Sequence, residues 1–539
     1  MALIISIIPI LLLFVLMMGF KMPGFKSALI TIVVTVLLGI LVVPSLGMLP
    51  EKLAGESVAG IALWALVEGT LKAIFPILIV ILMAIYSYNI LVESKEIETI
   101  KRQFTSISDD KGILVLILVW GFGGLLEGMA GFGTAVAIPA AILIGLGFKP
   151  MFSALVSLLA NSVPVAFGAV GIPVTTLCNE ITPGGAAPAE MVCEVAALTV
   201  VQLAPLFFLM PFVILMITDR KAIVKNVTLT LWTGGFSLAT QYICARFLGA
   251  ETPAILGSLA AIVSIIVYAK LFVRKKAAVL TTDGRSMEID AAPASFGFGE
   301  TFRAWSVYLF ILVFILLSGA LFPSINGFLK SHLVTELHLP VIGSTFKFGW
   351  ISNAGLMLFL GATIGGLIQG LSPQRLMAIL ARTTVNLRNT IITIICLIAM
   401  SSVMNYFGMI SAIASGLVAM TGSFYPFFAP LIGGIGTFVT GSDTSSNILF
   451  GKLQANVAGQ LGLTHSSTFF GVSGNETNWL AAGNTTGATG GKIISPQSIA
   501  IATASCGMEG QDGEIIRKAL PYAIIYLLIG GAMIFLPLL

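Results

Sequence analysis

Long apolar stretches, separated by short polar loops, run through most of the chain. A transmembrane helix needs about 20 consecutive and mostly apolar residues. The stretches that meet this requirement are Ala2–Phe20, Phe25–Val43, Leu63–Val92, Val195–Thr218, Val227–Ala245, Pro253–Val273, Trp305–Leu321, Gly349–Leu371, Thr390–Tyr406 and Leu520–Leu538. A membrane-spanning barrel would instead show alternating segments of about 10 residues, and the sequence lacks that pattern. The apolar pattern therefore predicts an all-α polytopic membrane protein.

Two further regions, residues 112–192 and 427–508, are apolar but interrupted by Gly, Pro and polar residues. Short loops rich in Lys and Arg tend to stay in the cytoplasm, and such loops alternate along the chain with loops poor in both. The alternation places both termini outside and residues 274–303 inside, so the two interrupted regions cross the membrane in opposite directions. We therefore expect an inverted-repeat transporter with broken helices or re-entrant hairpins and about 12–14 membrane segments.

The interrupted regions divide the chain into consecutive parts. Membrane helices occupy 1–111, 193–273, 304–426 and 509–539, and the interrupted regions 112–192 and 427–508 carry the site. Residues 274–303 form the longest hydrophilic segment and are predicted to be a cytoplasmic linker between the two halves. This linker is too short for a catalytic domain.

The two interrupted regions share a motif. Each has an apolar run that ends in a glycine-rich polar tip, 123–133 in the first and 436–446 in the second. Each then fits the pattern N-x6-G-x4-P, with Asn161, Gly168 and Pro173 in the first region and Asn484, Gly491 and Pro496 in the second. Non-helical backbone at membrane depth must face protein or a water-filled cavity, and half-helix N-termini there offer free N–H donors to an anion. The alternative is that the glycines only allow tight helix packing.

Composition supports the membrane assignment. Hydrophobic residues make up 57% of the chain and charged residues 10%, whereas soluble domains carry about 25% charged residues; the mean hydropathy is +1.02. These values exclude a secreted soluble enzyme, a nucleic-acid-binding protein and a disordered chain. The 5 cysteines show no metal-ligand spacing and are expected to be buried thiols, with a Cys178–Cys193 disulfide as the alternative.

Motifs of membrane-associated enzymes are absent from the sequence. There is no HExxH, and the run Gly-Ala-Thr-Gly-Gly-Lys492 is followed by Ile493 and has a misplaced first glycine, so it is not a nucleotide-binding P-loop. An intramembrane aspartyl protease needs two membrane aspartates, and only Asp443 qualifies. We expect no catalytic residues, no metal and no cofactor.

Ionisable residues within the membrane are costly and are therefore candidate functional residues. Glu127 and Asp443 lie at the two polar tips, where desolvation would favour the protonated form, and Lys492 lies in the second motif. The acids are candidate proton carriers; alternatively they cap a half-helix or pair with a lysine. Lys492 is expected to hold a carboxylate, to pair with Asp443 or to extend to the membrane interface.

Other charged residues within apolar stretches have simpler explanations. Glu68 and Lys72 are four residues apart and are expected to form an ion pair on one helix. Lys452 and Arg246 are expected at the membrane interface.

Long segments of the chain resemble the L-lactate permease family of bacterial carboxylate transporters. The matching segments are GFGGLLEGMAGFGTAVAIPAAILIGLGFKP from Gly121, NSVPVAFGAVGIP from Asn161, TGSDTSSNILFGKLQ from Thr440 and GNTTGATGGKIISPQSIAIA from Gly483. The resemblance implies uptake of L-lactate, with D-lactate and glycolate as further substrates, by proton symport across the bacterial cytoplasmic membrane. Residues 464–479 are longer and more polar than the family pattern, which leaves the specificity among short hydroxy acids open.

The predicted substrate site combines both interrupted regions. Amides and hydroxyls supply donors and acceptors for the carboxylate and hydroxyl of lactate, and a lysine adds a point charge. The predicted binding residues are Asn161, Asn484, Thr485, Thr486, Ser445 and Lys492, together with Gly131 and Gly168. Because its sequence neighbours are apolar, Glu127 is the preferred proton carrier, and Asp443, among Ser and Thr, is an organiser of the site.

The expected partners are lactate, a proton and the lipid bilayer, with no nucleic acid. The sequence leaves the oligomeric state open. Two alternatives remain for the function: a passive anion channel or membrane receptor, and a transporter of another small carboxylate coupled to sodium. Titratable acids at both tips favour the proton symporter, because a channel needs none.

Overall fold

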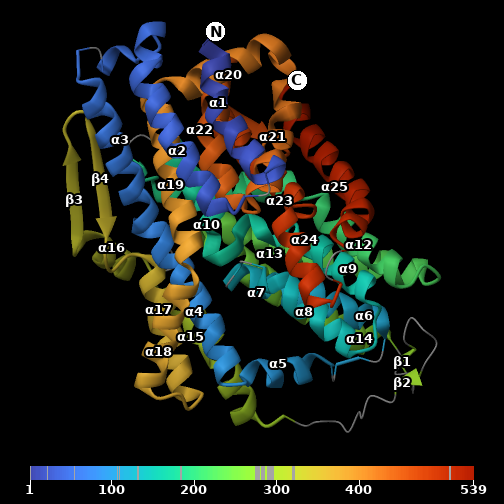
Figure 1. Ribbon diagram of the computed structural model, residues 1–539. Helices are drawn as coiled ribbons and strands as arrows, with labels where there is room; N and C mark the ends of the chain where they lie inside the picture. Colours follow the sequence, from blue (N-terminus) through green and yellow to red (C-terminus); the bar gives the residue numbers. More distant parts are fainter. Residues whose placement is uncertain are drawn as a thin grey trace.

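The protein is a bundle of helices with short antiparallel hairpins at its edges (Figure 1). The computed structural model describes residues 2–20, 22–53, 55–105, 107–108, 110–129, 131, 133–182, 185–273, 279–280, 286–287, 296–318, 322–508 and 511–539. Within these residues, 9 helices are long and apolar enough to cross a membrane, and the pair α11–α12, bent by 43°, forms a further span. Four shorter apolar helices, Ala2–Met17, Thr134–Gly145, Pro150–Asn161 and Ala354–Ile368, accompany them. The predicted fold class, an all-α polytopic membrane protein, is confirmed.

The helices outside the interrupted regions have the following bounds. They are α1 (Ala2–Phe14), α2 (Gly24–Leu41), α3 (Val58–Lys72), α4 (Ile79–Glu93), α5 (Glu96–Thr105), α11 (Ala189–Leu203), α12 (Leu206–Thr218), α13 (Ile223–Leu248), α14 (Pro253–Phe272), α15 (Phe298–Ser318), α16 (Pro323–Ser331), α17 (Ala354–Ile368), α18 (Pro373–Asn386), α19 (Arg388–Tyr406), α20 (Met409–Thr421) and α25 (Asp512–Phe535). The strands pair as β1 (Val279–Leu280) with β2 (Ser286–Met287), β3 (Val334–Leu339) with β4 (Ser344–Gly349), and β5 (Ser466–Phe469) with β6 (Val472–Asn475).

Local chemistry explains where the predicted helices differ from the observed ones. The stretch Leu63–Val92 is interrupted between α3 and α4, where Phe75 takes φ −121° and ψ 110° because it precedes Pro76 and a proline disfavours helical backbone before it. The stretch that was predicted to begin at Gly349 begins as α17 at Ala354, since β4 continues to Gly349 and the Asn353 side chain accepts the Gly355 N–H at 2.7 Å as an N-cap.

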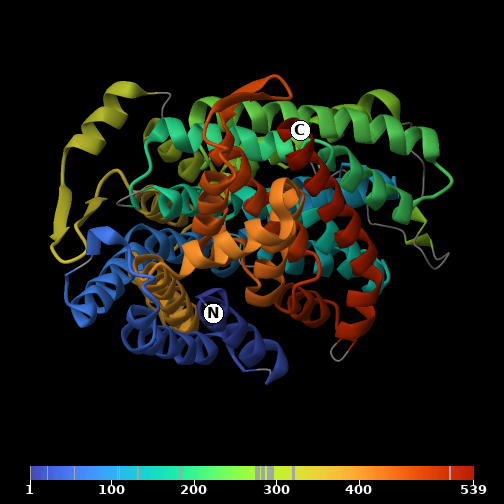
Figure 2. The ribbon, with the colours of Figure 1, turned by 90° about the horizontal axis from the view of Figure 1, so that it is seen from above.

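Two segments between the predicted apolar stretches contain regular structure. Residues 407–426 include the helix α20, whose residues are mostly apolar, and residues 322–347 include α16 and most of the β3–β4 hairpin. In Figure 2 this hairpin lies at the periphery of the molecule.

The two interrupted regions have the same order of elements. The first contains α6 (Lys111–Leu116), α7 (Gly123–Met129), α8 (Thr134–Gly145), α9 (Pro150–Asn161) and α10 (Gly168–Ile181), with α6 joined to α7 by a π-helical turn. The second contains α21 (Tyr425–Thr440), α22 (Asp443–Gln460), α23 (Glu476–Lys492) and α24 (Pro496–Ser505). Each is therefore a helix, a break, a helix, a return, a helix, a second break and a final helix.

The repeats interlock reciprocally. The last helix of the first repeat, α10, packs against α22, the second helix of the other repeat, and α24 packs in the corresponding way against α8. Asn447 on α22 reaches across this contact and donates to the carbonyl oxygen of Pro173 at 3.0 Å. In Figure 2 the orange segments, which include α21 and α22, lie between the dark blue N-terminal helices and the green helices.

The shared N-x6-G-x4-P motif matches the repeats at its proline, which stands near the start of the last helix of each, but not at its asparagine. Asn161 is the last residue of α9, whereas Asn484 lies within α23, which continues to Lys492. A methyl group at Gly487 would collide with the carbonyl oxygen of Pro430, and one at Gly491 with the carbonyl oxygen of Gly434. These glycines therefore allow α23 to pack closely on α21, and Lys492 is the structural counterpart of Asn161.

The placement of the chain ends agrees with the predicted topology. Both termini lie at one end of the molecule in Figure 1, and β1 and β2 lie at the opposite end. Most of the predicted linker 274–303 lies outside the described residues, and which end faces the cytoplasm stays a prediction. All 5 cysteines are free thiols, so the alternative of a Cys178–Cys193 disulfide is not adopted.

Two buried ion pairs lie among the helices, one within α3 and one between α10 and α22. The predicted Glu68–Lys72 pair is confirmed at 3.2 Å, and Glu68 also accepts hydrogen bonds from Ser344 at 2.8 Å and Tyr406 at 3.0 Å. Lys452 pairs with Glu180 at 2.8 Å and is 9% exposed. The expectation that Lys452 lies at the membrane interface was wrong, because α22 is covered by α10 along this face.

We predict that Lys452→Met lowers the thermal stability of the purified protein in detergent. The substitution leaves the Glu180 carboxylate buried without a partner, which typically costs about 3–5 kcal/mol. The double variant Lys452→Met/Glu180→Gln should recover most of the loss. Lys518→Met is the matched control, because its i,i+4 pair with Glu514 is exposed, and it should not shift the unfolding temperature. Equal destabilisation by the single and double variants would contradict the prediction.

Candidate functional site

A cavity of about 430 Å³ lies where the helix breaks of both repeats meet. Its lining comes from four sources: the two breaks of the first repeat, the two breaks of the second repeat, the turn between α1 and α2, and one face of α19. The bilayer requires non-helical backbone to face protein or water, and the breaks satisfy this requirement by facing one another across the cavity.

The first repeat contributes a buried carboxyl group. Glu127 on α7 is 3% exposed, and its Oε1 lies so close to Gly168 that a methyl group there would be only 2.6 Å away. The other oxygen, Oε2, has no hydrogen-bond partner among the described residues. Gly131 (φ +62°) packs on Ala169, so the two breaks of this repeat touch each other and the carboxyl group lies between them.

A strained turn begins α10 beside Glu127. Ala169, Val170 and Gly171 have φ values of 44°, 60° and 74° before the right-handed helix resumes. A β-branched residue such as Val170 is rarely found in this region, and a side chain at Gly171 would collide with the carbonyl oxygen of Ala250. Strained backbone of this kind concentrates at ligand sites, and Ala169 and Ile172 both line the cavity.

The second repeat presents a helix N-terminus to the cavity. Gly441 (φ +74°) ends α21, and the Ser442 side chain caps α22 by accepting the Ser445 N–H at 3.3 Å. Asp443, in the first turn of α22, is 3% exposed, and neither of its oxygens has a hydrogen-bond partner within the described ranges. The partial positive charge of the helix N-terminus favours an anion at this position.

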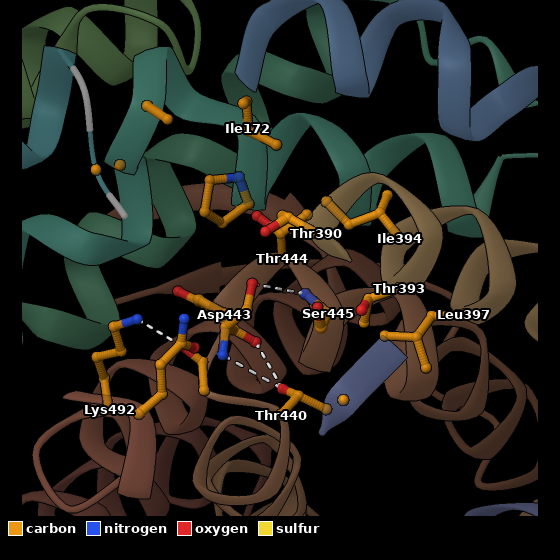
Figure 3. Close-up of a pocket in the computed structure, with 18 of the residues that line it drawn as sticks. Ile172, Thr390, Thr393, Ile394, Leu397, Thr440, Asp443, Thr444, Ser445 and Lys492 are labelled. Atoms are coloured by element: carbon orange, nitrogen blue, oxygen red, sulfur yellow. Dashed lines mark hydrogen bonds between the residues drawn. The ribbon is translucent and has the colours of Figure 1, made fainter. Parts of the chain in front are cut away.

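Lys492 joins the two breaks of the second repeat. It is the last residue of α23, is 9% exposed, and donates from Nζ to the carbonyl oxygen of Gly441 at 2.5 Å. The alternative that it extends to the membrane interface was therefore wrong. A lysine has three donors, and the recorded bond uses one of them. Lys492 and Asp443 lie at the same cavity (Figure 3). Together with Glu127, they bring one amine and two carboxyl groups to it.

The structure places six of the predicted site residues at the cavity. They are Glu127, Gly131, Gly168, Asp443, Ser445 and Lys492.

The other four predicted residues do not line the cavity. Asn161 is buried at the end of α9. Asn484 and Thr485 bond to Asn447, each at 2.9 Å, and Thr486 bonds to Gln202 at 2.7 Å. Because these three lie in the middle of α23, they hold neighbouring helices together rather than face the cavity.

The sequence interpretation missed the side of the cavity that lies outside the repeats. Thr390, Thr393, Ile394 and Leu397 form one face of α19, and Leu13, Met17 and Phe25 approach from the α1–α2 region. The polar pair Thr390 and Thr393 at i,i+3 spacing was the available signal. From sequence alone, however, α19 is one apolar helix among many, and nothing in its pattern places this face against the breaks.

Within the described part of the chain, no three His, Cys, Asp or Glu residues are grouped so as to hold a metal ion. The residues at the cavity can bind a small anion through the lysine, the hydroxyls and the helix N-terminus. Its carboxyl groups can exchange a proton. The geometry therefore fits a binding site for a small anion that moves together with a proton.

Comparisons with known proteins identify the family. The family model described as L-lactate permease matches residues 2–539. The chain is 39% identical to an L-lactate permease of Streptococcus iniae, over 85% of this chain and 91% of the relative. It is 32% identical to the glycolate permease GlcA of Escherichia coli K12 (97% and 93% covered) and 31% identical to an L-lactate permease of the same strain (98% and 94% covered).

Among solved structures, the YdaH transporter of Alcanivorax borkumensis aligns with a TM-score of 0.33 at 13% identity, covering 81% of this chain and 87% of that one. This score is too low to support any argument. The sequence relatives are permeases rather than enzymes and match nearly the whole length. This chain is a multi-pass cell-membrane permease, and it belongs to the L-lactate permease family.

Proposed function

We propose that the protein takes up L-lactate together with a proton, and that the cavity between the broken helices is the substrate site. The observation that carries the proposal is the meeting of one lysine and two buried carboxyl groups in a single cavity. The relatives named L-lactate permease and glycolate permease support a small 2-hydroxy acid as substrate.

The substrate carboxylate binds between Lys492 and the N-terminus of α22. Lys492 supplies a positive charge, and the first turn of α22 supplies free N–H groups and the positive end of the helix dipole. The hydroxyls of Thr440, Thr444 and Ser445 line the same part of the cavity and can donate to or accept from the substrate hydroxyl. This assignment retains Lys492 and Ser445 of the predicted residues and replaces the amides with hydroxyls from the end of α21 and the start of α22.

Charge balance at the site couples the anion to the proton. A buried site strongly disfavours any added charge. A bound lactate anion adds one negative charge beside Lys492, Glu127 and Asp443. The net charge of the site stays the same only when one of the two carboxyl groups takes up a proton at the same step. One lactate is thereby matched by one proton.

We assign the transported proton to Glu127 and the organising role to Asp443. Asp443 lies in the first turn of α22, where the helix dipole stabilises a negative charge. Glu127 lies against the backbone of Gly168 on a helix whose neighbouring residues Leu125, Leu126 and Met129 are all buried and apolar. Because Glu127 has no helix N-terminus to stabilise its charge, desolvation favours proton uptake by this carboxyl group when lactate binds.

The experiment that tests the function uses purified protein in liposomes. An inward pH gradient should accumulate labelled L-lactate above its external concentration, by up to about tenfold per pH unit for one proton per lactate. Because co-transport of one lactate anion with one proton moves no net charge, an imposed membrane potential should have little effect on the final lactate concentration inside the liposomes. A sodium gradient alone should give no accumulation. Equilibration without accumulation would identify a passive channel, and accumulation driven by sodium would overturn proton coupling.

We predict that Lys492→Met raises the KM for lactate at least tenfold. A hydrogen bond to a charged group contributes about 1.5–3 kcal/mol, which corresponds to roughly a 10- to 150-fold change. Lys270→Met, at the exposed end of α14, is the control and should transport normally. If the KM of Lys492→Met is unchanged, Lys492 does not bind the substrate, and its role is limited to the hydrogen bond with the carbonyl oxygen of Gly441.

We predict that Glu127→Gln abolishes accumulation driven by a pH gradient but retains exchange of labelled for unlabelled lactate. Glutamine mimics the protonated acid, so the variant with lactate bound can still change conformation. Because glutamine neither takes up nor releases a proton, the pH gradient can no longer drive accumulation. The comparison variant is Asp443→Asn, which should impair exchange as well as accumulation because it alters the binding site. If Glu127→Gln still accumulates lactate against its gradient, Glu127 is not the proton carrier, and this role would be assigned to Asp443.

A further inference from the structure

One side of the cavity has no charged residue and no role in the proposed chemistry. It is formed by Leu13, Met17, Phe25, Ile394 and Leu397, which we call the apolar wall. Leu13 and Met17 come from α1 and its π-helical extension, Phe25 from α2, and the last two from α19. Because none of these helices belongs to either repeat, the apolar wall is independent of the residues that bind the carboxylate.

The groups around the cavity follow a spatial order. In Figure 3 Lys492 lies on one side of Asp443, Ser445 lies on the other side, and Thr393, Ile394 and Leu397 lie beyond Ser445. The order from charged amine through hydroxyls to apolar side chains matches the order of groups in a 2-hydroxy acid: carboxylate, hydroxyl-bearing carbon, then side chain.

The cavity is large for lactate alone. The cavity has a volume of about 430 Å³. Lactate has only six heavy atoms, and glycolate has no side chain at all. Pockets of roughly 300–1,000 Å³ usually enclose considerably larger ligands. With lactate bound at Lys492, much of the apolar wall would still face water.

We infer that the apolar wall receives the side chain at C2 of the substrate, and that the protein accepts 2-hydroxy acids with apolar side chains larger than methyl. This inference rests on the proposed function, since it uses the same carboxylate site. The class extends from lactate through 2-hydroxybutyrate to 2-hydroxy-4-methylpentanoate. Leu397 and Ile394 are then specificity-determining residues.

The test measures inhibition of labelled L-lactate uptake by glycolate, 2-hydroxybutyrate and 2-hydroxy-4-methylpentanoate in the same liposomes. Each methylene that becomes buried against the wall should lower the inhibition constant by about three- to fourfold. Liposomes preloaded with 2-hydroxy-4-methylpentanoate should also stimulate entry of labelled lactate by exchange, which requires that the larger acid is transported. The acid without the hydroxyl, 4-methylpentanoate, controls for non-specific effects on the membrane and should inhibit far less.

Substitutions in the apolar wall test whether it causes the preference for larger side chains at C2. Leu397→Trp should raise the inhibition constant of 2-hydroxy-4-methylpentanoate relative to that of glycolate at least tenfold. The matched control is Ile395→Trp, which is on the same helix but does not line the cavity, and this ratio should stay as in the wild type. Ile394→Phe is a smaller change that tests the same wall if the tryptophan variant does not fold.

The outcomes separate this inference from the proposed function. If lactate uptake is driven by a pH gradient but inhibition weakens steadily as the side chain grows, the inference fails and the proposed function stands. Inhibition by the larger acid without exchange would show that it binds but is not a substrate, which overturns the extension of the substrate class. If lactate itself is not taken up, the proposed function fails first.

Discussion

The backbone's need for hydrogen bonds inside a bilayer determines how this molecule is built. Every break in a membrane helix exposes N–H and C=O groups that lipid cannot satisfy. Here the breaks are brought together: Gly131 packs on Ala169 in the first repeat, and Lys492 donates to the carbonyl oxygen of Gly441 in the second. The reciprocal contacts of α10 with α22 and of α24 with α8 then hold the two pairs of breaks on one cavity. A polar site at the centre of the repeats is a direct consequence.

Part of this arrangement could be predicted from the sequence. The apolar stretches gave the helices, because a membrane-spanning length of apolar residues has few other uses, and the glycine-rich tips located Glu127 and Asp443. The motif matched the repeats incorrectly at its asparagine and glycine because glycine has two opposite uses in membrane helices. At Gly441 it provides a left-handed backbone that ends a helix, whereas at Gly487 and Gly491 it provides a close contact with α21 within an unbroken helix. The residue type alone does not separate these uses.

The face of α19 at the cavity and the Glu180–Lys452 pair depend on which helices become neighbours. Residues 180 and 452 come from different repeats, and Thr393 comes from outside both. Sequence periodicity reports the environment along one helix but not the identity of the helix opposite. Those parts of the site therefore required the three-dimensional structure.

The buried charges fall into two groups that differ in their partners. Glu68, Lys72, Glu180 and Lys452 are joined in ion pairs of 2.8–3.2 Å, and Glu68 has two further hydroxyl donors. Glu127 Oε2 and both oxygens of Asp443, in contrast, have no hydrogen-bond partner among the residues described. A paired charge is held in one protonation state by its partner and serves packing. An unpaired carboxyl group at the edge of a cavity is stabilised only when a proton or a ligand completes it, and this requirement lets the arrival of one species favour the arrival of the other. The helix α22 carries both kinds of group: Asp443 lies in its first turn at the cavity, and Lys452, near its middle, pairs with Glu180 at the C-terminal end of α10. This ion pair therefore joins the two repeats at a distance from the cavity and leaves the first turn of α22 free to face it.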